Sequence, residues 1–326
     1  MYNGVRESGC GRDAGSAIAS ATGRSESEKT SVFKEGYMQV ELSNDTIQAV
    51  FDTHGAELKS LKKNGREYMW NADPAYWNRT SPVLFPFVGA VCGGEYRYHG
   101  YTYPMGQHGF ARDMEFEIAA QTNTSVSFRL DSNAETLDVY PFEFELTIIY
   151  SLNNNKLQVS WLVKNLDNKQ MYFSIGGHPA FMVKTDERGT FSGNYLQFDS
   201  HETLIATDFA DGLVQDATHE IKLDEDGCMA IDEHTFDNGV HIIEHDQVQK
   251  VSLLDSDKKP YVTLEFSTPI VGIWSPEKKN APFLCIEPWY GRADAAGFNG
   301  DLQERKYEQS LEPGEVFRGG YQMKFD

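Results

Sequence analysis

The sequence of 326 residues is poor in cysteine and has no long apolar run. Its four cysteines are far apart and form no C-x-x-C pair, a spacing that fits neither a zinc site nor a small disulfide scaffold. No segment approaches the ~18 consecutive apolar residues of a membrane helix, and the first residues contain no apolar stretch of signal-peptide length. We therefore predict a cytoplasmic protein without a membrane partner.

Basic residues are also few. The chain has 29 Lys and Arg against 49 Asp and Glu, which gives a formal net charge of −20 at pH 7. Nucleic-acid binding depends on Lys and Arg that neutralise phosphates, and a strongly negative protein repels polyanions. The composition thus predicts no nucleic-acid partner, whereas a neutral small molecule is not affected by this charge.

Aromatic residues, in contrast, are abundant, with 20 Phe, 16 Tyr and 5 Trp. They lie among Val, Ile and Thr, side chains that suit a half-buried pleated surface. From Met38 onward, short runs of alternating apolar residues, such as FEFELTIIYSL and KLQVSWLV, are separated by turn residues. Segments of helical period are scarce, with residues 301–309 and the region 223–236 as candidates. The pattern predicts an all-β fold, a large antiparallel β-sandwich with few short helices.

Residues 1–34 differ in composition from the rest of the chain. They are rich in Gly, Ser, Ala and charged residues and lack apolar periodicity, a composition typical of disorder. We predict that they form a disordered leader or a segment left from expression. Because no linker rich in Gly, Pro or Ser interrupts the remainder, residues 35–326 are predicted to form one β-sandwich domain. For its assembly we expect a monomer or a weak homodimer.

Three short segments depart from the strand pattern and place a titratable residue beside Gly or Pro. They are GQHGFAR with His108, GGHPAF with His178, and CIEPWYG with Glu287. Glycine allows unusual backbone angles and close approach, and proline restricts the preceding residue to extended geometry. Each residue alone is more often an ordinary turn residue. Together, two imidazoles and a carboxylate form a set suited to general acid and base catalysis.

These segments belong to a longer series of motifs. In order, WNRTSPVLFPFVG, YPMGQHGFARD, GGHPAF and APFLCIEPWYG resemble the aldose 1-epimerase (galactose mutarotase) family, specifically its LacX-like branch. The resemblance covers residues 38–326. It implies the galactose mutarotase-like supersandwich, a hexose as the substrate, and catalysis without a metal or another cofactor.

The resemblance also implies a role for individual residues. Glu287 corresponds to the catalytic base, His178 to the acid, and His108 and Arg79 to residues that position the sugar. The family has a further aspartate that binds sugar hydroxyls. Asp237 is the candidate for it, although the local spacing departs from the family pattern, which leaves substrate specificity open.

The proposed chemistry explains these residue types. Mutarotation removes a proton from the anomeric O1 while the ring oxygen gains one, and the open aldehyde then rotates and recloses. A carboxylate with a pKa of about 4.3 can accept a proton, and an imidazole with a pKa near 6.5 can deliver one. His108 can share the acid role with His178. Trp289 offers an apolar ring face for the C–H groups of a sugar.

Three alternatives remain open on the sequence alone. Two histidines and a carboxylate on a β-sandwich also describe a facial-triad iron site, although the three residues lie far apart and form no H-x-H pair. A hexose-phosphate 1-epimerase needs basic residues at the rim of the pocket, and Arg79, Arg112 and Lys184 are candidates. A carbohydrate-binding protein without turnover can have the same fold.

Overall fold

The computed structural model describes the chain except for residues 1–30, 35–36, 186–188 and 190. Most of the predicted leader therefore lies outside the described residues. Its last part does not, because Ser31–Lys34 form β1 and pair antiparallel with β2 (Tyr37–Ser43). Strand pairing thus begins before the predicted boundary, since a pairing of four residues leaves little trace in the composition of a long segment.

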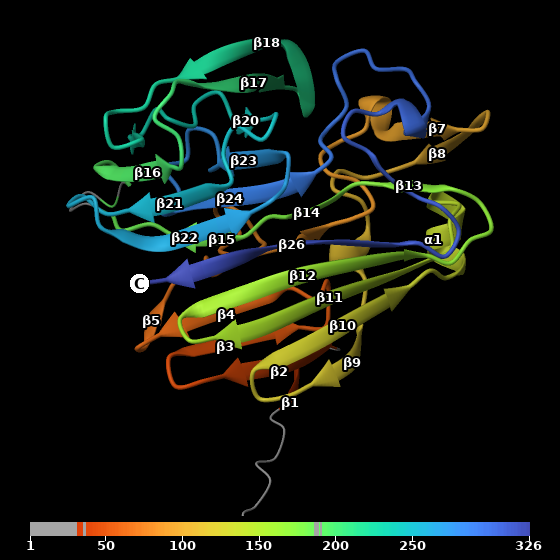
Figure 1. Ribbon diagram of the computed structural model, residues 1–326, viewed down its shortest axis with the longest axis horizontal. Helices are drawn as coiled ribbons and strands as arrows, with labels where there is room; N and C mark the ends of the chain where they lie inside the picture. Colours follow the sequence, from red (N-terminus) through yellow and green to blue (C-terminus); the bar gives the residue numbers. More distant parts are fainter. Residues whose placement is uncertain (1–30, 35–36, 186–188, 190) are drawn as a thin grey trace, which may run out of the picture.

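Three antiparallel sheets form most of the fold, which confirms the predicted all-β sandwich (Figure 1). The nine-stranded sheet has the order β19 (Cys228–Ile231), β16 (Asn194–Phe198), β21 (Lys250–Leu254), β22 (Pro260–Phe266), β26 (Val316–Phe325), β12 (Lys156–Asn165), β11 (Phe144–Asn153), β10 (Ser125–Asp131) and β9 (Glu117–Gln121). The eight-stranded sheet has the order β18 (Leu213–Ile221), β17 (Leu204–Ala210), β20 (His241–Ile243), β23 (Ile270–Trp274), β24 (Phe283–Tyr290), β14 (Ile175–Gly177) and β6 (Val83–Leu84), and β15 (Ala180–Met182) pairs with β24.

Smaller elements complete the fold. The five-stranded sheet continues from β2 through β3 (Ile47–Asp52) and β4 (Leu58–Lys63) to β5 (Arg66–Glu67). Two ribbons pair β7 (Glu95–Tyr98) with β8 (Tyr101–Pro104) and β13 (Met171–Phe173) with β25 (Gln309–Leu311). The described helices are short: α1 (Ala134–Val139) and the 3₁₀ turns η1 (Cys92–Gly94), η2 (Ala111–Asp113) and η3 (Leu302–Glu304). None of them is long and apolar enough to cross a membrane.

The helix predictions were partly right. The candidate at residues 301–309 contains η3, whereas the candidate at 223–236 was wrong, because this region holds β19 and turns. Helix α1 was not predicted. It begins after Asn133, whose side chain accepts a hydrogen bond from the backbone N–H of Thr136 in a reciprocal capping box.

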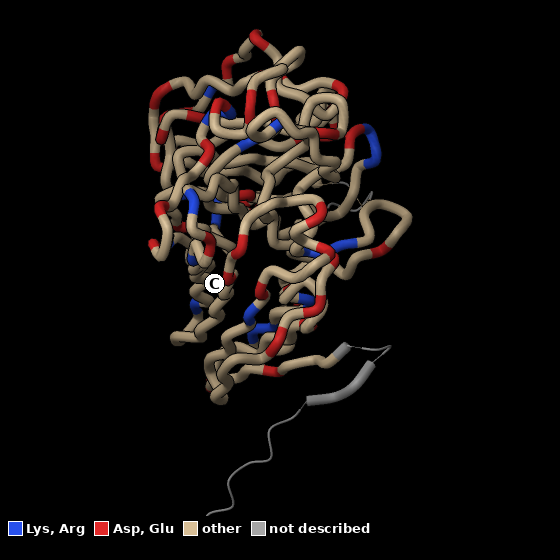
Figure 2. Tube along the Cα trace, turned by 90° about the vertical axis from the view of Figure 1, so that its right-hand side faces the viewer, with Lys and Arg blue, Asp and Glu red and all other residues tan. Residues whose placement is uncertain are grey.

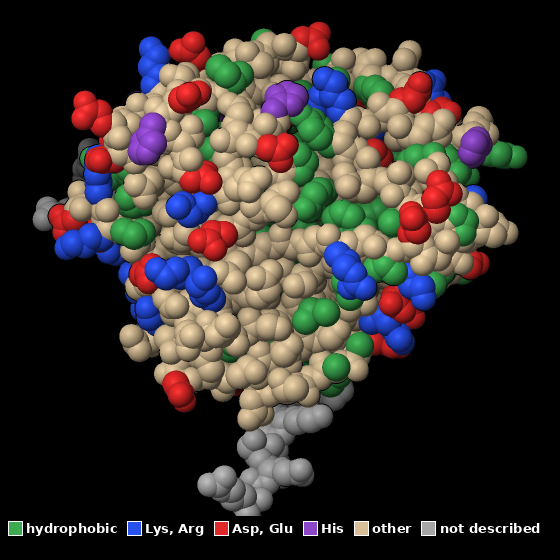
Figure 3. Space-filling model, in the orientation of Figure 1, with side chains coloured by type: hydrophobic (Ala, Val, Ile, Leu, Met, Phe, Trp, Pro, Cys, Tyr) green, Lys and Arg blue, Asp and Glu red, His purple; other side chains and the backbone are tan. Residues whose placement is uncertain are grey.

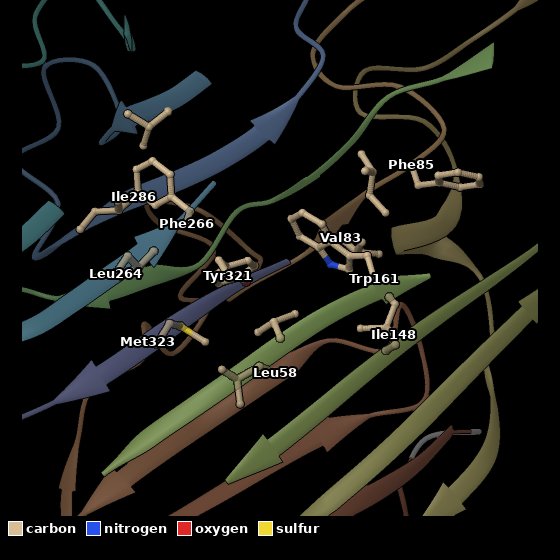
Figure 4. Packing of buried hydrophobic residues seen from close by; sticks show 14 of the residues in the cluster. Leu58, Val83, Phe85, Ile148, Trp161, Leu264, Phe266, Ile286, Tyr321 and Met323 are labelled. Atoms are coloured by element: carbon tan, nitrogen blue, oxygen red, sulfur yellow. The ribbon is translucent and has the colours of Figure 1, made fainter. Parts of the chain in front are cut away.

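The nine-stranded sheet is the layer against which the other two sheets pack. Along β12 every second residue is buried, as the alternating sequence pattern requires. Phe51 of β3 packs on Tyr150 of β11 with ring centroids 4.5 Å apart. Leu264, Tyr321 and Ile286, which come from β22, β26 and β24, belong to the same cluster of buried apolar side chains (Figure 4). All three sheets therefore contribute to one cluster of buried side chains.

Strand β24 carries the sandwich core and the candidate site on opposite faces. Its side chains are buried on both sides except at the last residue. Leu284 and Ile286 belong to the main cluster, whereas Cys285, Glu287 and Trp289 alternate with them and point to the other face. The strand therefore fixes the carboxylate of Glu287 on a rigid element.

Charged residues of both signs are interspersed along the described chain and over the face of the molecule that Figure 3 shows (Figures 2 and 3). On that face the acidic residues are scattered and do not form a single patch.

Candidate active site

Two glycines make room for the indole ring of Trp289. A Cβ atom on Gly176 would lie 2.6 Å from Trp289 Cδ1, and a Cβ atom on Gly272 would lie 2.6 Å from Cη2 of the same ring. Gly272 is paired with Glu287 across β23 and β24. The first glycine of the GGHPAF motif is thus needed for close packing, and this packing sets the position of the ring beside Glu287.

His178 follows β14 directly and faces Glu287. Its backbone N–H donates to the carbonyl oxygen of Pro82 at 3.1 Å, which ties the GGHPAF segment to the neighbouring β6 region. The Nε2 atom of His178 lies 3.2 Å from Oε2 of Glu287, and both residues are buried. The two atoms are close but not hydrogen-bonded, and Oε2 of Glu287 has no hydrogen-bond partner among the described residues.

Two tryptophans hold the imidazole ring of His178. The Trp77 ring stacks on it with centroids 4.6 Å apart and an interplanar angle of 26°. The Trp274 ring meets the imidazole edge to face, with centroids 5.5 Å apart and an angle of 87°. The two contacts restrict rotation of the ring about its side-chain bonds and exclude water from its face.

His108 is held by a reciprocal pair of backbone contacts with Gly89. The backbone N–H of His108 donates to the Gly89 carbonyl at 2.8 Å, and the Gly89 N–H donates to Nδ1 of His108 at 3.0 Å. Because Nδ1 accepts a hydrogen bond, the proton of the neutral ring is on Nε2. His108 has a φ of 67°. Gly109 follows it, and a Cβ there would lie 2.3 Å from the Phe85 carbonyl oxygen.

Burial shifts the titration of all three groups towards their neutral forms. Desolvation lowers the pKa of His178 to about 3, with smaller contributions from nearby arginines. Desolvation and the neighbouring His178 lower the pKa of His108 well below its ordinary value. The pKa of Glu287 is raised well above its ordinary value because the carboxylate is desolvated. Burial therefore favours the neutral imidazoles of His108 and His178 and the protonated carboxyl group of Glu287.

The three residues border one cavity of about 300 Å³, a volume at the small end of ligand-binding sites. Aromatic rings and a few polar groups form its wall, a combination suited to a small polar molecule with apolar faces. The lining residues are Trp77, Gly89, Gln107, His108, Arg112, His178, Phe209, Val240, Ile242, Trp274, Glu277, Glu287, Trp289 and Ala293.

The structure places the remaining predicted residues differently. Arg79 does not line the cavity, and its guanidinium is paired with Asp113 at 2.7 Å. Arg112 lines it instead and donates from Nη2 to the carbonyl of Gln107 at 2.7 Å. Lys184 pairs with Asp255 outside the cavity wall.

Asp237 is also outside the wall of the cavity. Its carboxylate contacts Nδ1 of His234 at 2.9 Å on the surface. The chain around it contributes Val240 and Ile242 to the wall, and both are apolar. In this conformation the sugar-binding acid that the family resemblance implies is therefore not supplied by Asp237.

Five polar or aromatic lining residues were not predicted from the sequence, namely Trp77, Gln107, Phe209, Trp274 and Glu277. Trp77 directly precedes Asn78-Arg79 and Gln107 directly precedes His108, so both belong to the motifs quoted above. Their position in these motifs could have identified them as site residues. Trp274 and Glu277 stand at and after the end of β23, and only the pairing of β23 with β24 brings them to the site.

The arrangement does not match a facial-triad iron site. Among the described residues, the group of potential metal ligands in this region comprises His178, Cys285 and Glu287, and it does not include His108. The two histidines and the carboxylate considered from the sequence thus do not form the compact set that this alternative requires.

The antiparallel β-sandwich places this structure among the galactose mutarotase-like β-sandwich proteins. The sequence model of the aldose 1-epimerase family matches residues 38–324, and the chain belongs to this family. Membership of this sugar-processing family implies a small carbohydrate as the substrate.

Individual relatives support the same assignment. Protein LacX (chromosomal) of Lactococcus lactis subsp. lactis is 29% identical over 88% of this chain and 99% of its own length, which confirms the LacX-like branch. A galactose mutarotase related enzyme from Lactobacillus acidophilus has a similar structure, with a TM-score of 0.84 and 36% identity over 89% of this chain and 97% of its own. A galactose mutarotase-like protein from Lactobacillus casei also has a similar structure, with a TM-score of 0.83. Its sequence is 32% identical, and the match covers 88% of this chain and 100% of its own.

Proposed function

We propose that the protein is an aldose 1-epimerase that interconverts the α and β anomers of a hexose by general acid and base catalysis. The observation that supports this function is the buried pair of His178 Nε2 and Glu287 Oε2, 3.2 Å apart at a cavity of about 300 Å³. Such a pair can hold one proton in two ways, as neutral imidazole with carboxylic acid or as imidazolium with carboxylate.

The second arrangement is the working form in the proposed mechanism. The carboxylate of Glu287 takes the proton from O1 of the sugar, the C1–O1 bond becomes a carbonyl, and the bond between C1 and the ring oxygen breaks. The imidazolium of His178 gives its proton to the ring oxygen. The pair ends as neutral imidazole and carboxylic acid, the arrangement that burial favours. Rotation about C1–C2 and the reverse proton transfers form the other anomer.

His108 supports this reaction as a donor of a hydrogen bond. Because Gly89 N–H fixes Nδ1 as an acceptor, the Nε2–H group of the neutral ring is available to the ring oxygen or a neighbouring hydroxyl. In this proposal His178 transfers the proton and His108 orients the oxygen that receives it. Trp289 supplies an apolar face in the wall, as predicted from its place beside Glu287.

The composition of the wall favours a neutral hexose over a hexose phosphate. Arg112 is the basic residue of the lining, and Glu277 of the same lining is acidic. A dianionic phosphate is bound best by several cationic donors, and a carboxylate in the wall opposes it. We infer that the substrate is an unphosphorylated aldose, and we retain the expectation of a cytoplasmic monomer or weak homodimer.

The test is the rate at which fresh α-D-glucose and α-D-galactose change optical rotation. The wild-type protein should accelerate mutarotation of at least one of them, and Glu287→Gln and His178→Asn should abolish the acceleration while remaining folded. Faster turnover of glucose 6-phosphate than of glucose would favour the phosphate alternative. Sugar binding without any acceleration would contradict the proposal and indicate a carbohydrate-binding protein.

A further inference from the structure

We propose that His178, Cys285 and Glu287 form an inhibitory site for a divalent metal ion of the zinc type. One ligand atom of each residue lies within 4.8 Å of the other two, and all three residues are buried. Cys285 and Glu287 are two residues apart on β24, so their side chains leave the strand on the same face. This thiol has no part in the proposed reaction.

The distances suit a tetrahedral metal centre. Bonds of about 2.0–2.1 Å from zinc to nitrogen and oxygen place those two ligand atoms ~3.3 Å apart. His178 Nε2 and Glu287 Oε2 are 3.2 Å apart. A bond of about 2.3 Å to sulfur needs separations of ~3.6 Å from the other two ligand atoms, so the Cys285 sulfur has to move by at most roughly 1.3 Å. A side-chain rotation can supply this movement.

The ligand atoms are also available. Among the described residues, Oε2 of Glu287 has no hydrogen-bond partner, although it is fully buried and faces His178. An unpartnered buried carboxylate oxygen lacks the stabilisation that water would give, and a cation supplies it. One nitrogen, one sulfur and one oxygen ligand are typical of zinc and of Co²⁺ in its place, whereas Mg²⁺ and Ca²⁺ prefer oxygen alone.

A metal ion at this position leaves its fourth coordination site to water or to a sugar hydroxyl, because His178 and Glu287 line the cavity. The ion occupies the lone pair on Nε2 of His178 and that on Oε2 of Glu287. These lone pairs carry the proton in the proposed reaction, so a bound metal ion stops it. The inhibition rests on the proposed function, but the binding of the metal does not.

The binding is tested with Co²⁺ on full-length protein that carries no histidine tag. Bound Co²⁺ with a thiolate ligand gives a charge-transfer band in the near ultraviolet and the visible bands of a tetrahedral centre. We expect both with wild-type protein at one equivalent, with Zn²⁺ displacing the Co²⁺. Cys285→Ala should lose the thiolate band. Cys228→Ala is the matched control, because Cys228 is also a buried free cysteine but lies on β19, away from the cavity, and the variant should keep the band.

The inhibition is tested by optical rotation with increasing Zn²⁺. Cys285→Ala should retain the basal activity and need at least about tenfold more Zn²⁺ for half inhibition than wild type or Cys228→Ala. Equal zinc sensitivity of Cys285→Ala and wild type, or bound Co²⁺ without a thiolate band, would overturn the proposal. If Cys285→Ala does not fold, Cys285→Ser serves in its place. The wild-type protein could lack mutarotase activity and still show a cobalt spectrum that depends on Cys285. This result would support the metal site and would contradict only the proposed function.

Discussion

Strand β24 has two faces that are both shielded from solvent and that differ in chemistry. Leu284 and Ile286 on one face pack into the main hydrophobic cluster, where burial stabilises the fold. Glu287 on the other face is buried to the same extent, but burial opposes the ionisation of its carboxylate and raises its pKa. The comparison shows that one strand can serve two purposes. The residues on its core face stabilise the fold, and the residues on its opposite face supply reactive groups.

The sharpest test of this division is Glu287→Gln. We expect the rate of mutarotation to fall by about 10²–10⁴, because the substitution removes the general base while it keeps the shape of the side chain. The melting temperature at neutral pH should not fall. The pKa of Glu287 is higher in the folded protein than in the unfolded chain. Its contribution to stability is therefore fully present below the unfolded pKa and is lost as the pH rises through the folded pKa. Removal of the carboxylate thus costs no stability at pH 7. Parallel optical rotation and thermal unfolding check both parts.

The matching change on the other face is Ile286→Ala. It removes buried methyl groups from the core and should lower the free energy of unfolding by about 2–5 kcal/mol. The value of kcat for the folded protein should stay close to that of wild type. Denaturant unfolding and kinetics at a temperature well below the transition measure the two quantities. A large loss of kcat in folded Ile286→Ala would show that the two faces are not independent.

The pH dependence of kcat/KM is a third test. An ordinary imidazole would place a limb of the profile near pH 6.5. Because burial lowers the pKa of His178 to about 3 and raises that of Glu287, we expect the acid limb near pH 3 and the alkaline limb well above the ordinary range of a glutamate. At low pH the pair gains a second proton and the base is lost. At high pH the shared proton is lost and no acid remains. An acid limb near pH 6.5 would contradict the buried geometry.

The contact between Trp77 and His178 yields a smaller expected effect. Trp77→Leu removes the ring that stacks on the imidazole at 4.6 Å, so His178 gains rotational freedom and water gains access to it. We expect kcat to fall by about tenfold, KM to change less, and the acid limb to move towards pH 6.5. Trp77→Phe keeps an aromatic ring and should restore most of the rate. A change in KM alone would assign Trp77 to sugar binding instead.

Much of this site could be predicted from the sequence, whereas the residues whose position depends on tertiary pairing and strand register could not. Alternation of apolar residues predicted the β-sandwich, and Gly and Pro beside His108, His178 and Glu287 marked residues that the fold brings to one cavity. Arg112 lines the cavity and Arg79 does not, although both guanidinium groups are paired with Asp113, and such tertiary placement leaves no local pattern in the sequence. The contribution of Trp274 likewise depends on strand register, which is set by pairing across the sheet.

The smallest expected effect tests how far the site extends beyond β24. Asp237→Asn should leave kcat/KM within about twofold of wild type and change stability by less than about 1 kcal/mol, because the carboxylate contacts His234 on the surface and does not border the cavity. A rise in KM of tenfold or more would mean that the segment before β20 moves when sugar binds and brings Asp237 to a hydroxyl. The polar face of β24 would then be completed by a mobile segment, whereas its apolar face is completed by rigid sheets.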